Sequence, residues 1–290
     1  MKTNNSEMII DTHIHIWDTN KSSYDWLAGA PELLKRTYAI EELDAARKTA
    51  GIGAGIFVQA DVQMEDSFHM LDVARNTDWI KGVVSWLPLA DTDRTAQLLE
   101  QRLLNDAYFV GVRHLIHDEK DPQWLLQPVV IESLKILAAH NIPYDVVGVL
   151  PEHIETIIKV TELVPGLRMV FDHLNAPPIS SGERFGQWGI LMQEVARNKN
   201  ICAKISGLGT VAGAGKFTAS ELKPYLAFIL EHFGTDRCFC GGDWPVSLLA
   251  KDYVYTWQVY KEVLSALLSA EGLSNVYAGN AIRFYNLKLD

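Results

Sequence analysis

The feature that most constrains this sequence is a regular alternation between short apolar runs and longer amphipathic stretches. The short runs are rich in valine, isoleucine and phenylalanine and are bounded by glycine, proline, asparagine or aspartate, which is typical of buried β-strands. Strands that alternate with helices favour parallel pairing through βαβ units. Eight such runs occur, at residues 9–16, 54–60, 80–87, 109–115, 143–149, 168–174, 201–207 and 238–243.

Eight βα units in a chain of 290 residues predict an α/β fold, a closed (β/α)₈ barrel of the TIM type that occupies residues 1–290 as a single domain. The competing fold is an open, doubly wound sheet, which usually carries a glycine-rich phosphate-binding turn after its first strand. The first run here ends in His-Ile-His-Ile-Trp-Asp, which has no such turn. Helices are expected between the strands, for example at 41–50, 66–79, 126–140, 151–163 and 221–234.

The composition argues against several kinds of partner. The chain has 26 lysine and arginine residues against 36 aspartate and glutamate residues, so its formal net charge is −10 and it offers no basic surface to nucleic acid or an anionic membrane. No apolar run approaches the roughly 18 residues of a membrane span, and the polar N-terminus MKTNNSEM lacks the apolar region of a signal peptide. Cys202, Cys238 and Cys240 lie in apolar runs, which indicates reduced core thiols and a cytoplasmic location.

The first strand carries two histidines in an otherwise apolar setting. Residues two apart in a strand point to the same side, so His13 and His15 share a face. We expect that face to point into the barrel, with both imidazoles at the C-terminal mouth where barrel enzymes keep their chemistry. The inward set would be Ile9, Asp11, His13, His15 and Trp17, and the set under the helices Met8, Ile10, Thr12, Ile14 and Ile16.

Polar or ionisable side chains recur at the C-terminal ends of the other predicted strands. A barrel that served only as a scaffold would not need so many buried polar groups, each of which is costly to desolvate. Their recurrence therefore favours an active site at the mouth. These residues are Gln59, Trp86, Arg113, His114, Asp145, Asp172, His173, Lys204, Ser206 and Asp243.

Each of these residues also has a structural interpretation. Asp243 could be a turn residue after two glycines, and His173 could cap the next helix. Arg113 could form a structural ion pair with Asp145, and Lys204 could extend to the mouth. The coincidence of so many polar strand ends favours function over these alternatives. The other histidines, at 69, 117, 140, 153 and 232, are interpreted as structural helix or loop residues.

Seven short motifs occur along the chain: DTHIHIWD at 11–18, YDWL at 24–27, VRH at 112–114, FDH at 171–173, KISGL at 204–208, GGDWP at 241–245 and GNAIRFYNL at 279–287. In this order they resemble the amidohydrolase superfamily. The resemblance is to its amidohydrolase-related (amidohydrolase 2) lactonase branch, which includes fuconolactonases, rhamnonolactonases, sulfomuconolactone hydrolase and pyrone dicarboxylate lactonase. It covers essentially the whole chain, and the motifs are specific as a set.

The resemblance implies an amidohydrolase-type barrel in which water attacks the carbonyl carbon of a lactone. His13, His15, His173 and Asp243 match the catalytic core of the family, and His13, His15 and Asp243 would be the ligands of a metal ion. The superfamily's bridging carboxylated lysine on the fourth strand has no match, because residues 112–115 are Val-Arg-His-Leu. We therefore expect either no metal or one divalent ion, with Zn²⁺ as the first choice.

Lactone hydrolysis needs an activated water, a stabilised oxyanion and a proton for the leaving alkoxide. Asp243 is the expected general base and later proton donor, and His13, His15 and His173 are expected to stabilise the oxyanion, directly or through a metal. Further strand-end residues are expected to bind the substrate: Arg113, His114, Lys204, Trp17, Gln59, Trp86, Tyr144 and Trp244.

The expected substrate is a neutral sugar-acid lactone, because carboxylates at the predicted mouth outnumber the two cations, Arg113 and Lys204. Its identity depends on the loops at 18–38 and 175–188, whose conformation the sequence does not give. Two other functions stay open: a metal-dependent decarboxylase of the same superfamily, and a non-catalytic barrel that binds a ligand. Assembly into a homo-oligomer also stays open.

Overall fold

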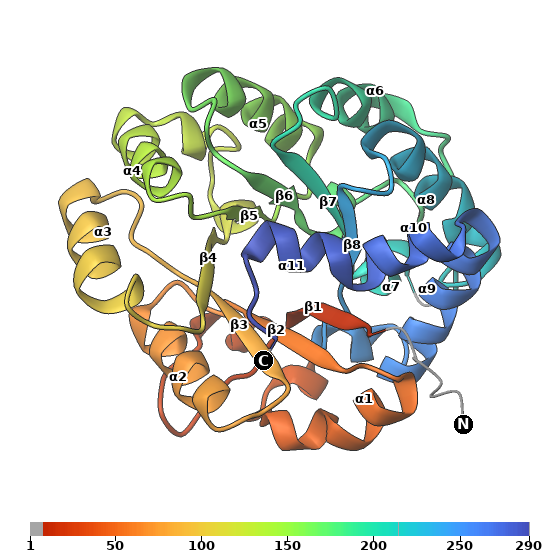
Figure 1. The fold of residues 1–290 in the computed structure, drawn as a ribbon, viewed down its shortest axis with the longest axis horizontal. Coiled ribbons are helices and arrows are strands. Elements are labelled where there is room, and N and C mark those ends of the chain that lie inside the picture. The colour runs from red at the N-terminus through yellow and green to blue at the C-terminus, as the bar shows by residue number, and fades with distance from the viewer. Residues whose placement is uncertain (1–7, 214, 290) are drawn as a thin grey trace.

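The computed structural model describes residues 8–213 and 215–289, and its frame is a ring of eight parallel strands (Figure 1). Each strand pairs with the next along the chain, which confirms the predicted (β/α)₈ barrel. Residues 1–7, which form most of the polar N-terminus discussed above, lie outside the described residues. The strands are β1 (Ile10–Ile14), β2 (Ala54–Val58), β3 (Ile80–Ser85), β4 (Phe109–His114), β5 (Tyr144–Val146), β6 (Met169–Phe171), β7 (Ile201–Ile205) and β8 (Cys238–Cys240).

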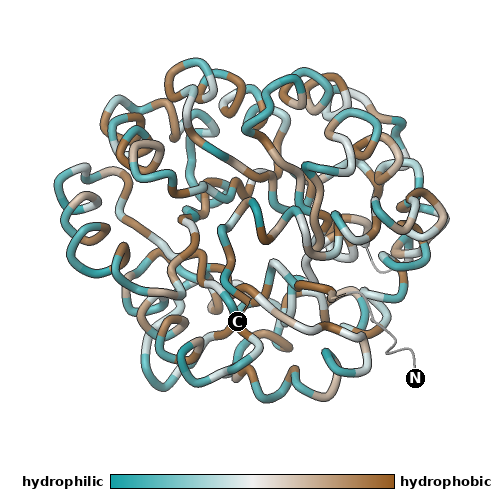
Figure 2. The backbone as a smooth tube through the Cα atoms, viewed as in Figure 1, coloured by the Kyte–Doolittle hydropathy of each residue, from teal (hydrophilic) through white to brown (hydrophobic). Residues whose placement is uncertain are grey.

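Helices follow every strand and surround the ring (Figure 1). Their hydrophilic residues face outward, and the strands are mostly hydrophobic (Figure 2). Within the described part of the chain, no helix combines the length and apolarity that crossing a bilayer requires. The helices are α1 (Asp44–Ala50), α2 (Met64–Arg75), α3 (Thr92–Leu98), α4 (Pro128–Ala139), α5 (Pro151–Leu163), α6 (Gly186–Val195), α7 (Leu208–Ala212), α8 (Ala219–Phe233), α9 (Tyr253–Leu267), α10 (Ala270–Ser274) and α11 (Asn280–Tyr285).

Several strands are shorter than the sequence predicts. β5, β6 and β8 have three residues each, although their apolar runs are longer. After β6 the backbone turns left-handed, with φ between 51° and 54° from His173 to Ala176, and this conformation ends the ladder. Polar residues predicted at strand ends, such as His173 and Asp243, therefore sit in the loops directly after the strands.

The ring closes between β1 and the segment after β8. The backbone N–H of Asp243 donates to the carbonyl of His13 at 2.8 Å, and that of His15 donates to the carbonyl of Trp244 at 2.7 Å. Glycine is required just before this junction, because a Cβ on Gly241 would lie 2.5 Å from the Cβ of His13. This close approach sets Asp243 beside the two histidines.

The strict alternation expected along β1 is wrong in its first half. Ile10 packs into the apolar cluster inside the ring, whereas Asp11 accepts a hydrogen bond from the hydroxyl of Tyr253 on α9, at 2.6 Å, outside it. An irregularity in the pairing of β1 with β2 lies between these residues and the end of the strand. It shifts the alternation, so that His13 and His15 still point toward the mouth.

The N-terminal end of the barrel is apolar and is covered by α11, which crosses the ring in Figure 1. Side chains from seven of the eight strands meet residues of α11 there in one cluster. The hydroxyl of Tyr285, at the end of α11, donates to Asp145 Oδ2 at 2.7 Å, where the apolar layer gives way to a polar one. The polar layer above it forms the base of the active site. The cluster includes Ile10, Ala54, Val84, Val110, Val170, Cys202, Phe239 and Phe284.

Candidate active site

A cavity of about 330 Å³ opens at the C-terminal ends of the strands. This is the end at which (β/α)₈ enzymes carry their active sites. Its wall combines polar side chains with a larger apolar share. The polar part includes His15, Arg113, His117, Asp118, His173 and Asp243, and the apolar part includes Leu115, Val147, Val149, Val211 and Val246.

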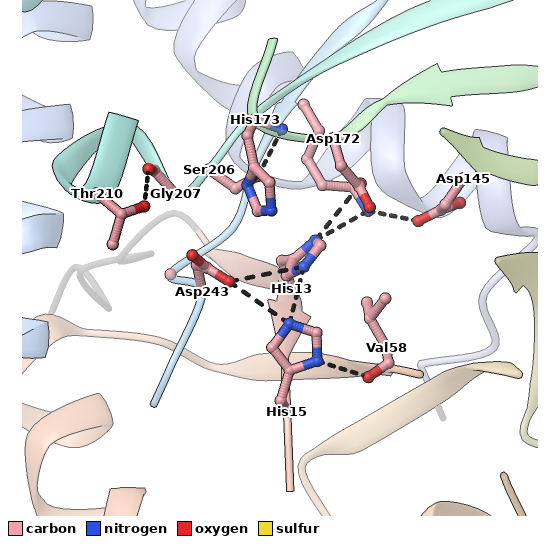
Figure 3. Close-up of polar contacts among 12 residues, drawn as sticks. His13, His15, Val58, Asp145, Asp172, His173, Ser206, Gly207, Thr210 and Asp243 are labelled. Carbon is pink, nitrogen blue, oxygen red and sulfur yellow. Dashed lines mark hydrogen bonds and ion pairs between the residues drawn. The ribbon is translucent and has the colours of Figure 1, made fainter. Parts of the chain in front are cut away.

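His13, His15 and Asp243 converge on one point at the base of this cavity (Figure 3). The two Nε2 atoms are 3.1 Å apart, and Asp243 Oδ1 lies 3.7 Å from that of His13 and 3.5 Å from that of His15. All three side chains are buried. Residues from both ends of the chain therefore present three potential ligand atoms to the same small volume.

The hydrogen bonds around the imidazoles leave both Nε2 atoms as electron-pair donors. The carbonyl oxygen of Val58 can only accept, so His15 Nδ1, 2.7 Å away, carries the proton. Arg113 can only donate, so His13 Nε2, 3.2 Å from its Nη1, is an acceptor. Burial lowers the pKa of both histidines and keeps them neutral.

This cluster fits a single metal ion. Two lone pairs and a carboxylate oxygen face one another without a proton between them, an arrangement that a cation would stabilise. Tetrahedral Zn²⁺ with bonds of about 2.0–2.1 Å separates its ligand atoms by roughly 3.3 Å. The observed separations of 3.1, 3.5 and 3.7 Å lie around that value.

Asp243 is poised as an ionised carboxylate. Burial alone would raise its pKa, but the neighbouring His173 offsets burial, and the pKa lies below its ordinary value. Its backbone has a φ of 58°, so the turn after Gly242 aims the side chain back toward the cavity. The backbone N–H of Gly242 is in turn held by Asp11 Oδ1 at 2.8 Å.

His173 approaches the same point from the opposite strands, and its ring centroid lies 4.6 Å from that of His13. Its Nδ1 is 2.9 Å from Ser206 Oγ, which also faces its backbone N–H at 3.3 Å. The Ser206 hydroxyl oxygen accepts a hydrogen bond from the backbone N–H of His173, so the hydroxyl can donate its own proton to Nδ1. The proton of the neutral imidazole is then on Nε2. Gly207 makes room for this ring, because a Cβ there would lie 2.3 Å from Nδ1.

Lys204 is fully buried and does not line the cavity. Its Nζ lies 2.5 Å from Asp145 Oδ2, 2.8 Å from Asp172 Oδ1 and 3.5 Å from His13 Nδ1. Burial works against ionisation of Asp172, but Lys204, His13 and Arg113 hold its pKa well below the ordinary value. Lys204 thus neutralises buried carboxylates beneath the histidines instead of facing a ligand.

Arg113 does line the cavity, but its charge is also matched. Its Nη1 lies 3.1 Å from Asp172 Oδ2, and Nε donates to Gln59 Oε1 at 3.0 Å. Nη2 donates to the backbone carbonyl of Gln59. Gln59 therefore orients Arg113 rather than lining the cavity itself. The ion pair expected between Arg113 and Asp145 is instead one between Arg113 and Asp172.

Other predicted substrate-binding residues are not brought to the cavity. The indole N–H of Trp86 donates to His114 Nδ1 at 3.1 Å, and His114 Nε2 is 2.8 Å from Glu119. Tyr144 is fully buried in the core, and Trp244 packs edge-on against Tyr38 at a centroid distance of 5.4 Å. Trp17 does reach the cavity wall.

His117 and Trp26 are among the wall residues that sequence reasoning missed. The sequence gives His117 a structural interpretation, as a helix or loop residue, but a short turn at Ile116–Asp118 brings it back over the mouth. Trp26 lies in the YDWL motif, inside the loop whose conformation could not be predicted. The motif itself was the only signal that could have pointed to it.

The fold and this histidine and aspartate cluster define a barrel of the kind that can activate water at its C-terminal mouth. The amidohydrolase family model matches residues 10–287, so the chain belongs to the amidohydrolase family. An L-fucono-1,5-lactonase of Burkholderia ambifaria is 31% identical over 281 residues, which are 96% of this chain and 95% of that protein.

Solved structures agree with this assignment. A zinc-bound amidohydrolase from Burkholderia multivorans superimposes with a TM-score of 0.87 at 27% identity, covering 97% of this chain and all of that one. A 5-carboxyvanillate decarboxylase from Sphingomonas paucimobilis superimposes with a TM-score of 0.69 at 12% identity, covering 98% of this chain and all of that one. At that identity, the second likeness concerns the fold alone.

Proposed function

We propose that this protein hydrolyses the lactone ring of a neutral sugar acid. The observation that carries the proposal is the convergence of His13, His15, His173 and Asp243 on the base of a cavity whose cations are already paired. The similarity to L-fucono-1,5-lactonase over nearly the whole chain supports the same class of reaction.

In the proposed mechanism, Asp243 accepts a proton from the attacking water as the water oxygen bonds to the lactone carbonyl carbon. The N–H that His173 presents from Nε2 stabilises the oxyanion. The bond between that carbon and the ring oxygen then breaks, and Asp243 returns the proton to the leaving alkoxide. The product is the open-chain hydroxy acid.

A metal ion fits this scheme without replacing these residues. His13, His15 and Asp243 would hold one divalent ion, with Zn²⁺ as the ion that their nitrogen and oxygen atoms suit. When bound, such an ion lowers the pKa of water and polarises a carbonyl. Lys204 and Asp172 support the site by fixing His13 from behind.

The charge of the wall supports a neutral substrate. Arg113 and Lys204 are balanced by Asp145 and Asp172, so the cations have no spare charge for a substrate carboxylate. Asp118 and Asp243 add negative charge to the wall. An anionic substrate would meet repulsion there, whereas hydroxyl groups would find hydrogen-bonding partners.

The test is a panel of neutral five- and six-carbon aldonolactones, with ring opening followed by acid release to a pH indicator. The same protein is incubated with aromatic carboxylic acids, and carbon dioxide release is measured. Saturable hydrolysis of at least one lactone without decarboxylation is the expected result. Decarboxylation alone, or binding of lactones without turnover, would replace the proposal with one of the two competing functions.

We also propose a cytoplasmic location, which the three buried, unbridged cysteines support, since thiols stay reduced in that compartment. Light scattering of the purified protein would show whether it forms a homo-oligomer.

A further inference from the structure

The loop that follows β4 is held by His114, a residue of the VRH motif that the proposed mechanism does not use. The indole N–H of Trp86 donates to His114 Nδ1, so the proton of the neutral ring lies on Nε2, which faces Glu119 Oε1 at 2.8 Å. The same ring stacks on Trp124, with 4.1 Å between the centroids and 2° between the planes. Because Glu119 and Trp124 both belong to the loop, His114 fixes its course at two points.

The first turn of this loop, Ile116–Asp118, reaches the active-site cavity, and His117 and Asp118 both line its wall. Partial burial lowers the pKa of His117, and Arg113 and His173 lower it further, which indicates that the imidazole lies near these two wall residues. Asp118 Oδ1 lies 3.6 Å from His117 Nε2. The carboxylate of Asp118 is therefore beside this ring at the mouth of the cavity.

The carboxylate of Asp118 is open to a ligand. Its side chain is 62% exposed, and its distance from His117 is too long for a hydrogen bond. No group within residues 8–213 and 215–289 donates a hydrogen bond to this carboxylate. Of the described residues that line the cavity, two are acidic, and the other one, Asp243, is the proposed general base. Asp118 is therefore the acidic residue of the wall that the chemistry leaves free.

A lactone whose carbonyl lies at His13, His15 and Asp243 has its far edge toward the open mouth, because these three residues are buried and Asp118 is exposed. In a sugar lactone that edge carries hydroxyl groups, and a carboxylate is a strong acceptor for a hydroxyl. We infer that Asp118 accepts a hydrogen bond from a substrate hydroxyl on the ring edge away from the carbonyl, and so selects hydroxylated lactones. This inference rests on the proposed function, because it places a sugar-like ring in the cavity.

The first test compares Asp118→Ala with the wild type on a parent lactone and its singly deoxygenated analogues. For the parent, kcat/KM should fall about tenfold, mostly through KM, because the bond lies away from the reacting atoms and stabilises bound substrate and transition state alike. The analogue that lacks the bonded hydroxyl should lose about as much with the wild type and little more with the variant. Asp121→Asn is the matched control. It removes the same charge from an exposed position of the same loop, keeps an acceptor for the backbone N–H of Gln123, and should behave as the wild type.

The second test reads the same hydrogen bond without turnover. A polyhydroxylated δ-lactam, which resists hydrolysis, is titrated calorimetrically into the wild type, Asp118→Ala and Asp121→Asn. The Kd should rise about tenfold in Asp118→Ala and stay within about twofold of the wild type in Asp121→Asn. If Asp118→Ala, shown to be folded by circular dichroism, binds the lactam and hydrolyses every lactone within about twofold of the wild type, the inference is wrong. An equal loss in Asp121→Asn would reveal a general effect of loop charge and would also overturn it.

The two arms separate the inference from the function. If no lactone is hydrolysed but the lactam binds about tenfold more weakly to Asp118→Ala, the proposed function fails and the role of Asp118 in binding a hydroxylated ring stands. If lactones are hydrolysed and neither readout responds to Asp118→Ala, only the role of Asp118 fails. If the protein neither hydrolyses a lactone nor binds the lactam at millimolar concentration, both are overturned.

Discussion

Asp66 gives a prediction whose size follows from its surroundings. Its carboxyl is fully buried on α2, where Oδ2 accepts the backbone N–H groups of Ala60 at 2.9 Å and Asp61 at 3.3 Å. Oδ1 faces the hydroxyl of Tyr24. Burial raises the pKa from its ordinary 3.8 to about 7, because these contacts only partly replace water around the charge.

A raised pKa means that the folded protein holds this proton more tightly than the unfolded chain does. Stability from Asp66 is therefore fully present below pH 3.8 and is lost as the pH rises toward 7. Between pH 5 and pH 8, the loss is about 2.5 kcal/mol, from slightly less than two effective pH units at 1.36 kcal/mol each. Asp66→Asn should abolish this pH-dependent loss of stability. An amide can accept hydrogen bonds from both backbone N–H groups and donate one to the Tyr24 hydroxyl, and it does not ionise.

The assay is urea unfolding of the wild type and Asp66→Asn at several pH values from 5 to 8. The difference in unfolding free energy between the two proteins should change by about 2.5 kcal/mol in favour of the variant as the pH rises. Subtracting the two curves removes the contributions of other buried acids. Asp72→Asn, at an exposed position on the same helix, should track the wild type. A difference that is constant across this range would refute the reasoning.

Three further predictions concern the active site. Asp243→Asn should lower kcat by about 10²- to 10⁴-fold while circular dichroism stays unchanged, and near-normal kcat in the folded variant would remove Asp243 as the base. Metal analysis of active protein should find one divalent ion per chain, and His15→Ala should lose that ion. Two ions per chain would contradict a single-ion site made of His13, His15 and Asp243. Lys204→Met should reduce the unfolding free energy by about 3–5 kcal/mol, because it leaves the buried carboxylates of Asp145 and Asp172 without this cation. A loss below about 1 kcal/mol would show that stability does not depend on these ion pairs.

The barrel and the core of the site could be predicted because both follow from the order of short apolar runs and from what stands at their ends. His13, His15 and Asp243 meet because parallel strands all end at one rim. Successive side chains of a strand point to opposite faces, so the sequence alone already implies that the neighbours Arg113 and His114 cannot both face the cavity. The structure turns Arg113 inward and His114 toward Trp86.

Other features depend on contacts that a linear pattern does not contain. The irregularity that places Ile10 inside the ring and Asp11 outside arises from pairing with β2. The return of His117 over the mouth depends on a short turn after β4. The choice of Asp172 rather than Asp145 as the partner of Arg113 depends on side-chain reach across the barrel.

The most direct test of the central claim compares kcat/KM for a neutral six-carbon aldonolactone with that for a carboxylated muconolactone-type substrate. Because Arg113 and Lys204 are already paired with buried carboxylates, the neutral lactone should be preferred, and Arg113→Met should weaken this preference little. A preference of a hundredfold or more for the carboxylated lactone, about 2.7 kcal/mol, would contradict the account.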